Sequence, residues 1–366
     1  MTKPSMAIAK KPSSRVGGGD PYVVCGCARS LETCKKVVEE LKSKGHATSL
    51  VVIEYEIYKD QNMDCNVFGK DDRHRMSYEG ARVVFVAALP TEKDTPAVTY
   101  AVRTICDCAP NIKEFTMVCT FFGCAQNDRS PKSTSGKIVT SKLVAEDVSN
   151  ALKRFKVPTR LAIVDMHNPC IKNYFTDVPV AHIWTMPTLL ADKIKRMGCP
   201  SNVTIVYPDQ GSYNRFHNEI QEYVHAYSIG VVICGKTRVN GQVDAVSVLA
   251  DDAPKLRNKH VLIVDDIVQS GSTLAKCSAA LQRYAPLSCA AVTVHAVLPD
   301  AEAVAKAGEM LKSGTLSELV TSDSNPDGAQ RAAQLALNKL PVRITPIAAI
   351  IAGHISSRRV QSPRRA

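Results

Sequence analysis

Two kinds of segment alternate along the chain. Short runs of apolar, β-branched or aromatic residues are separated by longer stretches in which apolar residues recur every three or four positions. Runs that are apolar at every position are typical of parallel strands buried on both faces, and the longer stretches are typical of amphipathic helices. The alternation predicts an α/β architecture with mainly parallel sheets flanked by helices. Predicted strands cover 22–28, 49–55, 82–89, 115–122, 160–167, 202–208, 229–236, 260–266, 289–297 and about 316–322; predicted helices cover 30–44, 95–109, 136–155, 187–197, 213–226, 273–284, 301–313 and 328–339, before a short strand and helix after Pro341.

The alternation falls into two similar series that meet near residues 180–186. A chain of 366 residues is also longer than one ordinary hydrophobic core requires. We therefore expect two α/β domains, at 20–182 and 183–350. A disordered basic arm at 1–19 and a basic tail at 351–366 would flank them.

Composition indicates the cellular compartment and the kinds of partner to expect. No apolar run is long enough to span a membrane, and the first residues lack the apolar core of a secretory signal, so a cytoplasmic protein without membrane contact is expected. The 13 cysteines are scattered without a CxxC pair, which favours buried free thiols in a reducing compartment. The net charge of +11 is concentrated at the two ends. Nucleic acid is therefore not an expected partner beyond weak contact by those ends.

The segment HVLIVDDIVQSGSTLAKC (260–277) carries the clearest chemistry. An apolar strand ends in Asp265 and Asp266, a loop of small residues follows, and a helix begins near Thr273. Backbone N–H groups of such a loop, together with a helix N-terminus, bind phosphate, and Gly271 permits close approach of the backbone. Adjacent carboxylates at a strand end can hold ribose hydroxyls directly or through Mg²⁺. The segment therefore predicts a site for a phosphorylated sugar.

This string resembles the phosphoribosyl pyrophosphate signature of the class I phosphoribosyltransferases and the ribose-phosphate pyrophosphokinases. The resemblance implies that each domain has the class I phosphoribosyltransferase-like fold. Four further segments resemble the pyrophosphokinases in particular: VYPDQGSYNRF (206–216), VVICGKTRVNG (231–241), CAQNDRSPKSTSGKIVTSKLVAEDV (124–148) and IVDMHNPCIKNYFTDVPV (163–180). The ribose-phosphate-binding residues that the resemblance implies are Asp265, Asp266, Gln269, Ser270, Gly271, Ser272 and Thr273.

The other segments imply roles for further residues. Lys236 and Arg238, two apart in a strand and so on one side of it, would be the catalytic pair that clamps the transferring phosphates under a flexible lid. Asp266 is a candidate general base by its position alone. The implied magnesium-binding residues are His167 and Asp209, and the implied ATP-binding residues are Gln126, Asn127, Arg129, Tyr58 and Asp60.

The chain departs from the family pattern in two loops. The nucleotide loop usually reads Arg-Gln-Asp before a base, but here Gln126 and Asn127 precede Asp128 and Arg129. In the loop that follows Asp265 and Asp266 (269–273, the sugar loop), Gln269 stands where an acid is usual. The spelling VDDIVQSG resembles the plant-type branch, which implies freedom from phosphate activation and a relaxed choice of nucleotide donor.

The resemblance implies a ribose-phosphate diphosphokinase. Such an enzyme transfers the pyrophosphoryl group of Mg·ATP to the C1 hydroxyl of ribose 5-phosphate, giving phosphoribosyl pyrophosphate and AMP for nucleotide biosynthesis. It also implies a homo-oligomer. Two alternatives stay open: a phosphoribosyltransferase, which would use the product as its substrate, and a catalytically inactive relative with a regulatory role. Of the three hypotheses, only the first predicts AMP release from ATP.

Overall fold

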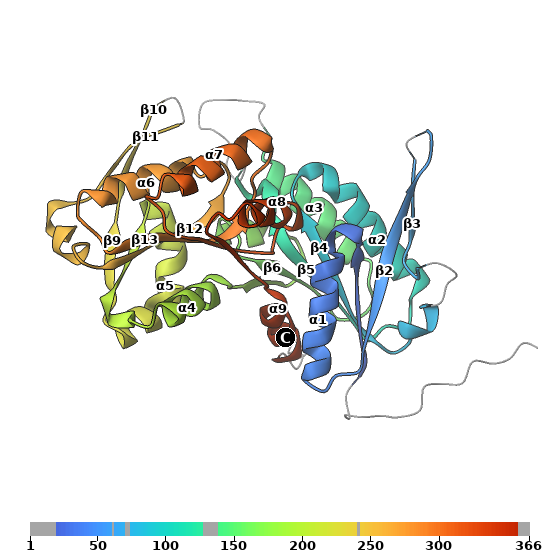
Figure 1. Ribbon diagram of the computed structural model, residues 1–366. Coiled ribbons are helices and arrows are strands. Elements are labelled where there is room, and N and C mark those ends of the chain that lie inside the picture. The colour runs from blue at the N-terminus through green and yellow to red at the C-terminus, as the bar shows by residue number, and fades with distance from the viewer. Residues whose placement is uncertain (1–19, 61, 70–73, 127–137, 240–241, 358–366) are drawn as a thin grey trace, which may run out of the picture.

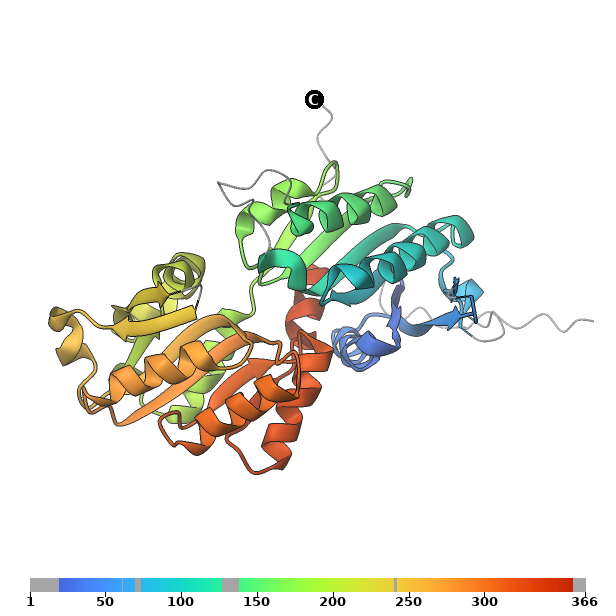
Figure 2. The same ribbon diagram turned by 90° about the horizontal axis from the view of Figure 1, so that it is seen from above.

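The computed structural model describes residues 20–60, 62–69, 74–126, 138–239 and 242–357. These residues form two α/β domains that lie side by side, each a twisted sheet covered by helices on both faces (Figures 1 and 2). The predicted disordered arm at 1–19 lies outside the described residues.

The first domain is built on a seven-stranded sheet in the order β3-β2-β1-β4-β5-β6-β7. All neighbouring strands are parallel except β2 and β3, which form an antiparallel hairpin. The elements are β1 (Tyr22–Cys27), α1 (Leu31–Ser43), β2 (Thr48–Ile57), β3 (Met63–Asn66), β4 (Arg82–Leu89), α2 (Thr95–Cys108), β5 (Glu114–Phe122), α3 (Thr140–Leu152), β6 (Thr159–Val164) and β7 (Val180–Ile183).

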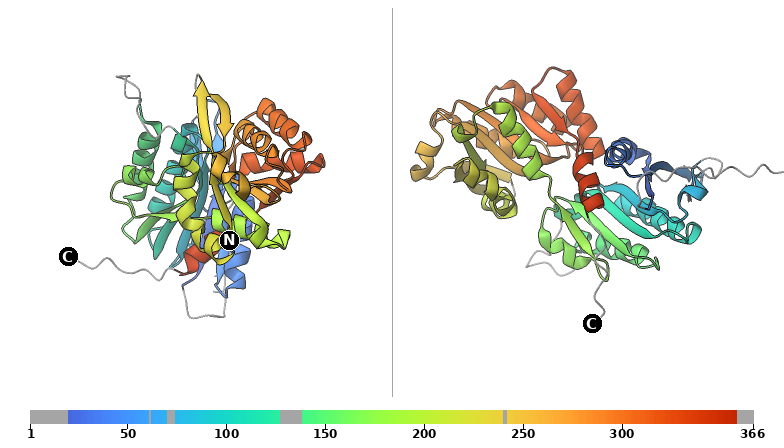
Figure 3. Two further views of the ribbon diagram at one scale, coloured as in Figure 1. Left: turned by 90° about the vertical axis from the view of Figure 1, so that its left-hand side faces the viewer. Right: turned by 90° about the horizontal axis from the view of Figure 1, so that it is seen from below.

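The second domain is built on a six-stranded, wholly parallel sheet in the order β15-β14-β13-β12-β8-β9. A separate antiparallel hairpin, β10–β11, stands out from this domain (Figure 3). The elements are α4 (Met186–Met197), β8 (Val203–Tyr207), α5 (Gln210–Ala226), β9 (Gly230–Ile233), β10 (Gly235–Val239), β11 (Gln242–Ser247), β12 (His260–Val268), α6 (Ser272–Gln282), β13 (Ser288–Ala296), α7 (Ala301–Lys312), β14 (Leu319–Ser322), α8 (Pro326–Leu337), β15 (Val342–Thr345) and α9 (Ala348–Ser357).

The hydrophobic core has three parts. One lies beneath α2 and α3 in the first domain, and another beneath α6, α7 and α8 in the second. The third is shared, because α1, α4, α5 and α9 bury apolar side chains such as Leu41, Leu189, Phe216 and Ile351 in one continuous cluster. The two domains are thus held together by a common apolar core.

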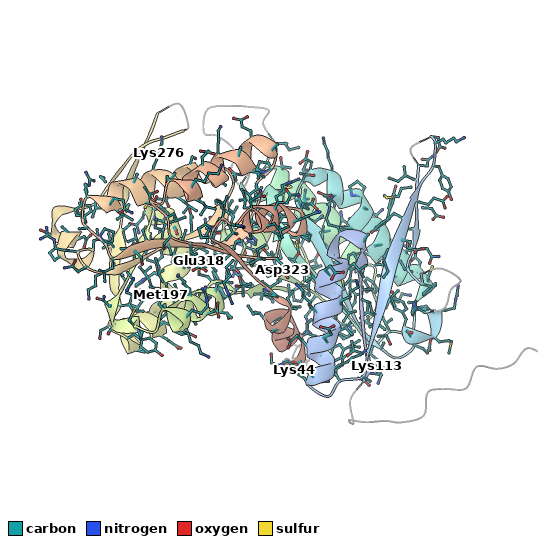
Figure 4. The ribbon with its side chains drawn as sticks, viewed as in Figure 1. Lys44, Lys113, Met197, Lys276, Glu318 and Asp323 are labelled. Atoms are coloured by element: carbon teal, nitrogen blue, oxygen red, sulfur yellow. The ribbon has the colours of Figure 1, made fainter. Side chains whose placement is uncertain are left out.

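Polar contacts support this junction. The Nζ of Lys36 on α1 lies 2.9 Å from Oδ2 of Asp323, which follows β14 in the second domain. Figure 4 labels Asp323 at this boundary, beside α1. The other carboxylate oxygen of Asp323 accepts a hydrogen bond from the backbone N of Ile347 at 2.9 Å, just before α9. One carboxylate therefore links the end of β14 to both α1 and the start of α9.

The predicted alternation and the two-sheet architecture are confirmed, and β4 has the predicted bounds. Several details differ. The strand predicted at 229–236 ends at Ile233, before a separate hairpin strand, and the strand predicted at 160–167 ends at Val164. β3 and β7 were not predicted; β3 is short and only partly buried, and β7 falls in the expected linker. The expected tail at 351–366 is wrong for 351–357, which belong to α9 and bury Ile351 and Ile355.

Candidate functional site

A cavity of about 500 Å³ opens at the carboxyl end of β12, where it faces the first domain. Open α/β sheets bind ligands at this end of their strands. The cavity is lined by all seven predicted ribose-phosphate residues and by both predicted metal ligands: Asp265, Asp266, Gln269, Ser270, Gly271, Ser272, Thr273, His167 and Asp209. The structure therefore brings together residues that lie as far apart in the chain as 167 and 273.

The loop between β12 and α6 has the conformation that a phosphate site needs. Gly271 has a φ of 75° and is the N-cap of α6. A Cβ atom there would lie 3.1 Å from the sulfur of Met310 and 3.6 Å from Cα of Ala307, so both the backbone angle and the close packing on α7 favour glycine. The first turn of α6, with its free N–H groups and the positive end of the helix dipole, lies at the cavity, which Gly271, Ser272 and Thr273 line.

His167 and Arg215 tie the acidic strand end to the first domain. His167 follows β6, and its Nδ1 lies 2.6 Å from Oδ2 of Asp266. Arg215 on α5 places NH1 2.8 Å from Oδ1 of the same carboxylate and donates from Nε to the backbone O of His167 at 2.7 Å. The side chains of Arg215 and Asp266 are 10% and 7% exposed. Both oxygens of Asp266 are thus engaged in a nearly buried, charge-assisted cluster.

The two adjacent aspartates differ in their electrostatics. Burial, together with the negative charges of Asp266 and Asp209, raises the pKa of Asp265 well above its usual value. Burial also acts to raise the pKa of Asp266. The hydrogen bond from His167 and the charge of Arg215 outweigh burial, however, and hold that pKa below its usual value. At neutral pH, Asp266 is therefore the firmly ionised member of the pair.

A second buried network lies behind the cavity. Asp165, at the end of β6, accepts hydrogen bonds from the backbone N of Thr185 at 2.8 Å and from the Thr185 hydroxyl. Its backbone O lies 3.1 Å from Nε2 of His295 on β13, and Nδ1 of His295 lies 2.8 Å from Oγ of Ser324. Burial lowers the pKa of His295 to about 4 and raises that of Asp165 to about 7. The network joins the carboxyl ends of β6 and β13 across the domain boundary.

Asp209 is placed by the start of α5. It is the N-cap of that helix, and its Oδ1 accepts from the backbone N of Ser212 at 3.0 Å. The hydroxyl of Ser212 donates to the backbone O of Val264 at 2.6 Å, which fixes the helix start against β12. The carboxylate is therefore held beside the acidic strand end by ordinary helix capping.

Several predicted residues lie elsewhere or outside the described residues. Lys236 and Arg238 lie in β10, but their side chains are outside the described part, and so is that of Gln126 at the end of the 3₁₀ helix η5 (Gly123–Gln126). Asn127 and Arg129 lie wholly outside it. Tyr58 and Asp60 are exposed in the β2–β3 turn and do not line the cavity. The roles of all these residues stay predictions.

Arg215 is a site residue that the sequence analysis did not predict. It lies in the segment 206–216, which resembles the pyrophosphokinases, but the sequence assigned it no role. Its spacing of six from Asp209 was the available signal. In a helix that starts at Gln210, this spacing places Arg215 about 1.7 turns from the N-cap. Its partners, His167 and Asp266, could not be found from spacing, because they come from different domains.

Comparisons with known proteins agree with the fold described above. A family model described as the phosphoribosyl transferase domain matches residues 189–315, which include β12 and the sugar loop. The crystal structure of phosphoribosylpyrophosphate synthetase from Mycobacterium smegmatis superposes with a TM-score of 0.70 at 17% identity, covering 92% of this chain and 98% of that one. The fold is therefore that of a two-domain protein of the phosphoribosyltransferase type.

Proteins of similar sequence indicate which group of phosphoribosyltransferase-type proteins this chain resembles. The chain is 25% identical over 275 residues to the chloroplastic ribose-phosphate pyrophosphokinase 3 of Arabidopsis thaliana, covering 75% of this chain and 62% of that protein. It is 24% identical over 323 residues to the mitochondrial ribose-phosphate pyrophosphokinase 3 of Spinacia oleracea, covering 87% and 73%. The chain thus spans about three fifths of the Arabidopsis relative. It is a relative of the ribose-phosphate pyrophosphokinases, and plant proteins are among the most similar ones.

Proposed function

We propose that the chain is a ribose-phosphate diphosphokinase, which transfers the pyrophosphoryl group of ATP to the C1 hydroxyl of ribose 5-phosphate. The observation that carries this proposal is the cavity at the end of β12. It combines a bare helix N-terminus, which suits a phosphate, with two carboxylates, which suit ribose hydroxyls. The names of the relatives point to the same reaction.

In this proposal the sugar phosphate is oriented by the second domain. The 5-phosphate occupies the loop of Ser270, Gly271, Ser272 and Thr273, where backbone N–H groups and hydroxyls donate to its oxygens. Asp265, which is partly exposed at the strand end, faces the ribose hydroxyls. Its raised pKa makes this carboxyl easier to protonate than an ordinary aspartate, and a protonated carboxyl can donate as well as accept a hydrogen bond.

The transfer breaks the bond between the α-phosphoryl bridging oxygen and the β-phosphorus of ATP. The C1 oxygen forms a new bond to that phosphorus, AMP leaves, and the hydroxyl proton is lost. Phosphoryl transfer of this kind depends on positioning and charge stabilisation more than on covalent help. Both oxygens of Asp266 are already engaged by His167 and Arg215. We therefore assign Asp266 a positioning role rather than that of a general base.

Lys236 and Arg238 are the proposed source of positive charge for the transferring group. Their strand β10 begins one residue after Cys234, and Cys234 directly follows β9, the edge strand of the second sheet. The antiparallel partner strand β11 contacts α6, the helix that starts at the sugar loop. A hairpin in this position can close over the cavity and exclude water.

The residues present fit a magnesium ion. His167 presents Nδ1 to a carboxylate, as metal-binding histidines commonly do, and this leaves Nε2 as the nitrogen for a ligand. Asp209 adds a carboxylate beside the same cavity. No group of three or more metal-binding side chains occurs among the described residues, as suits an ion held mainly by substrate phosphates and water. Magnesium bound with the nucleotide would neutralise phosphate charge.

Nucleotide binding and assembly belong to the same proposal. Tyr58 and Asp60 lie in the β2–β3 turn, at the end of the first domain that is remote from β9 and β10 (Figure 1). If they bind ATP, they do so in a neighbouring copy, which supports a homo-oligomer with shared sites. Among the described residues, no helix is long and apolar enough to cross a membrane. A cytoplasmic location stays a prediction, since the names of two relatives carry chloroplastic and mitochondrial addresses.

The proposal is tested by AMP formation from Mg·ATP with and without ribose 5-phosphate. Wild-type protein should release AMP only with the sugar, and Lys236→Ala should lower the rate by about 10²-fold or more. Lys312→Ala is the matched control, because Lys312 is exposed on α7 and pairs with Glu309. Well-folded protein that binds ribose 5-phosphate but forms no AMP would contradict the enzyme proposal and favour the inactive relative.

A further inference from the structure

His167 is carried by a buried turn that is held in an unusual conformation. β6 ends at Val164, and the next residue, Asp165, has a φ of 36°. This angle lies in the left-handed region, which non-glycine residues keep only when their surroundings hold them there. Asp165 and Met166 are each 1% exposed, so their backbone groups need partners within the protein. The direction of the His167 side chain therefore depends on the groups that bond to this turn.

Side chains from three elements bond to the backbone of the turn. Two of them, His295 on β13 and Arg215 on α5, donate to the carbonyl oxygens of residues 165 and 167. The N–H group between these two carbonyls is that of Met166, and it donates to Nε2 of His182 on β7 at 3.1 Å. His295 and Arg215 belong to the second domain, so His182 is the first domain's own contribution to this set.

The ring of His182 is suited to accept this hydrogen bond. A backbone N–H can only donate, so Nε2 of His182 carries no proton and the ring holds its proton on Nδ1. Burial is the main cause that lowers the pKa of His182 to about 4, and the ring is therefore neutral at neutral pH. The imidazole also stacks on the indole of Trp184, with 3.6 Å between ring centroids and 20° between planes, which fixes its orientation.

His182 acts on the site through another residue. It is not among the residues that line the cavity of about 500 Å³, whereas His167 lines that cavity and places Nδ1 2.6 Å from Oδ2 of Asp266. We propose that His182 is a positioning residue for His167: by accepting from Met166, it holds the turn in the conformation that presents the His167 imidazole to the cavity. This inference rests on the proposed function in giving His167 a part in the reaction.

A purely structural role for His182 makes a different prediction. His182 lies opposite Ile163 in the pairing of β7 with β6, so its loss could lower the unfolding free energy without a selective effect on the reaction. A positioning role predicts a selective effect on kcat, because a displacement of about 1 Å at a catalytic group can cost about 10²-fold in rate. Loss of one of the three contacts to the turn should cost less, about tenfold.

The test is a series of substitutions at His182. His182→Met removes the acceptor and keeps a flexible side chain that can fill the space. His182→Gln keeps an acceptor, because its amide oxygen can reach the position of Nε2. His182→Asn is a second variant without the acceptor, in case methionine prevents folding, since its shorter amide ends at the position of Nδ1. His260→Met is the matched control, because Nδ1 of His260 lies 2.8 Å from Oγ of Ser288 at the end of β12 that is remote from the cavity.

We expect kcat for sugar-dependent AMP formation to fall about tenfold in His182→Met and to stay within about threefold of wild type in His182→Gln and His260→Met. The Kd for ribose 5-phosphate, measured by calorimetry, should change less than about twofold in every variant, because the sugar loop belongs to the second domain. In protein that already carries His167→Gln, His182→Met should change the residual kcat less than about twofold, since the residue that His182 positions is absent.

Three results would overturn the inference. One is a kcat of the variants without the acceptor within about twofold of wild type. Another is a loss in His182→Gln equal to that in His182→Met. The last is a loss of the same size with and without His167→Gln, which would mean that His182 does not act through His167.

Amide hydrogen exchange makes the test independent of catalysis. Exchange in the segment 165–170, followed by mass spectrometry, should be about tenfold faster in His182→Met than in wild type and nearly unchanged in His182→Gln. If wild-type protein forms no AMP, the proposed function fails, and the exchange rates alone then decide whether His182 holds the turn. Equal rates in His182→Met and wild type would overturn the inference.

Discussion

The two domains share one topology but differ at the ends of corresponding strands. Leaving out β3 and the β10–β11 hairpin, each sheet places its strands in the order second, first, third, fourth, fifth and sixth along the chain. The third strand is β4 in the first domain and β12 in the second. β4 ends in the buried apolar residues Ala88 and Leu89. A rigid 3₁₀ turn follows it, closed by a capping box between Thr91 and Asp94. β12 has two aspartates among its last four residues, and a glycine loop follows the strand.

The fold thus supplies equivalent strand ends in both domains, but an acidic pair followed by a glycine loop occurs at β12 and not at β4. The first domain has no acidic pair at β4, yet it contributes His167 from the end of β6 to the second domain's cavity. Residues at the ends of its β4 and β5 also line one side of a second cavity, of about 280 Å³, between the two domains. In the proposed function, the second domain binds the sugar and the first domain completes the site.

Removal of the negative charge of Asp266, near the end of β12, should lower sugar-dependent AMP formation more than any other change considered below. Asp266→Asn keeps the shape but leaves the guanidinium of Arg215, which is 10% exposed, without its carboxylate. Breaking a buried pair costs about 3–5 kcal/mol. We expect sugar-dependent AMP formation to fall by about 10²–10³-fold in kcat/KM, measured in a steady-state assay. Asp192→Asn, at a half-exposed pair on α4, is the control. Equal effects of the two changes would contradict the special role of this strand end.

Replacement of Gly123 and Gly271 by alanine tests how the loop after β5 differs from the loop after β12. Gly123→Ala places Cβ 1.9 Å from a backbone oxygen, and we expect a loss of about 3 kcal/mol in unfolding free energy. Gly271→Ala meets a φ of 75° and the sulfur of Met310 at 3.1 Å, and should cost about 1–2 kcal/mol while weakening ribose 5-phosphate binding. Gly45→Ala has a similar φ of 83° but open space. Urea unfolding of the three variants should rank them in this order, with Gly45 last.

His295 should make the junction sensitive to acid. Burial lowers its folded-state pKa to about 4, against about 6.5 in an unfolded chain. The folded state therefore prefers the neutral ring, and stability is fully present above pH 6.5 and is lost as the pH falls toward 4. The loss amounts to at most about 3 kcal/mol, at about 1.4 kcal/mol per pKa unit. His295→Asn should flatten the urea midpoint over this pH range, whereas Ser324→Ala should lower it at every pH. If the urea midpoint of His295→Asn depended on pH as steeply as that of the wild type, His295 would not be the source of the acid sensitivity.

The ion pair across the domain boundary should matter least. Lys36 is 41% exposed, so Lys36→Met should cost only about 0.5 kcal/mol, as exposed pairs do. Asp323→Ala should cost more, about 1–2 kcal/mol, because it also leaves the backbone N of Ile347 without its acceptor. Thermal unfolding of both variants measures the difference. Equal losses would mean that the ion pair, and not the backbone contact, holds this corner.

The alternation of apolar runs was enough to predict the fold. Buried parallel strands leave a continuous apolar signal, as β4 and β5 show with every residue from Val83 to Leu89 and from Glu114 to Phe122 buried. β3 leaves no such signal, because its residues are half-exposed and it pairs with only one neighbour. A short helix after Pro341 was predicted, but its extent was not: residues 351–357 were expected in the basic tail, whereas Ile351 and Ile355 are buried by packing on another domain.

The site was predictable where its residues are consecutive. The sugar loop is one continuous segment, and all seven of its predicted residues line the cavity. Arg215 received no role because its importance comes from contacts with His167 and Asp266, which are 48 residues away in one direction and 51 in the other. The second cavity could not be predicted either. It is made by four strand ends from two domains, and no local pattern records their meeting.

Assembly of one active site from both domains is tested most directly at His167, the residue that the first domain places beside Asp266. The measurement is kcat for sugar-dependent AMP formation by His167→Gln, beside the affinity of the same variant for ribose 5-phosphate. We expect kcat to fall by about 10²-fold or more and the sugar Kd to change less than about threefold, because the sugar loop belongs to the second domain. An unchanged kcat would contradict the claim and confine the chemistry to the second domain.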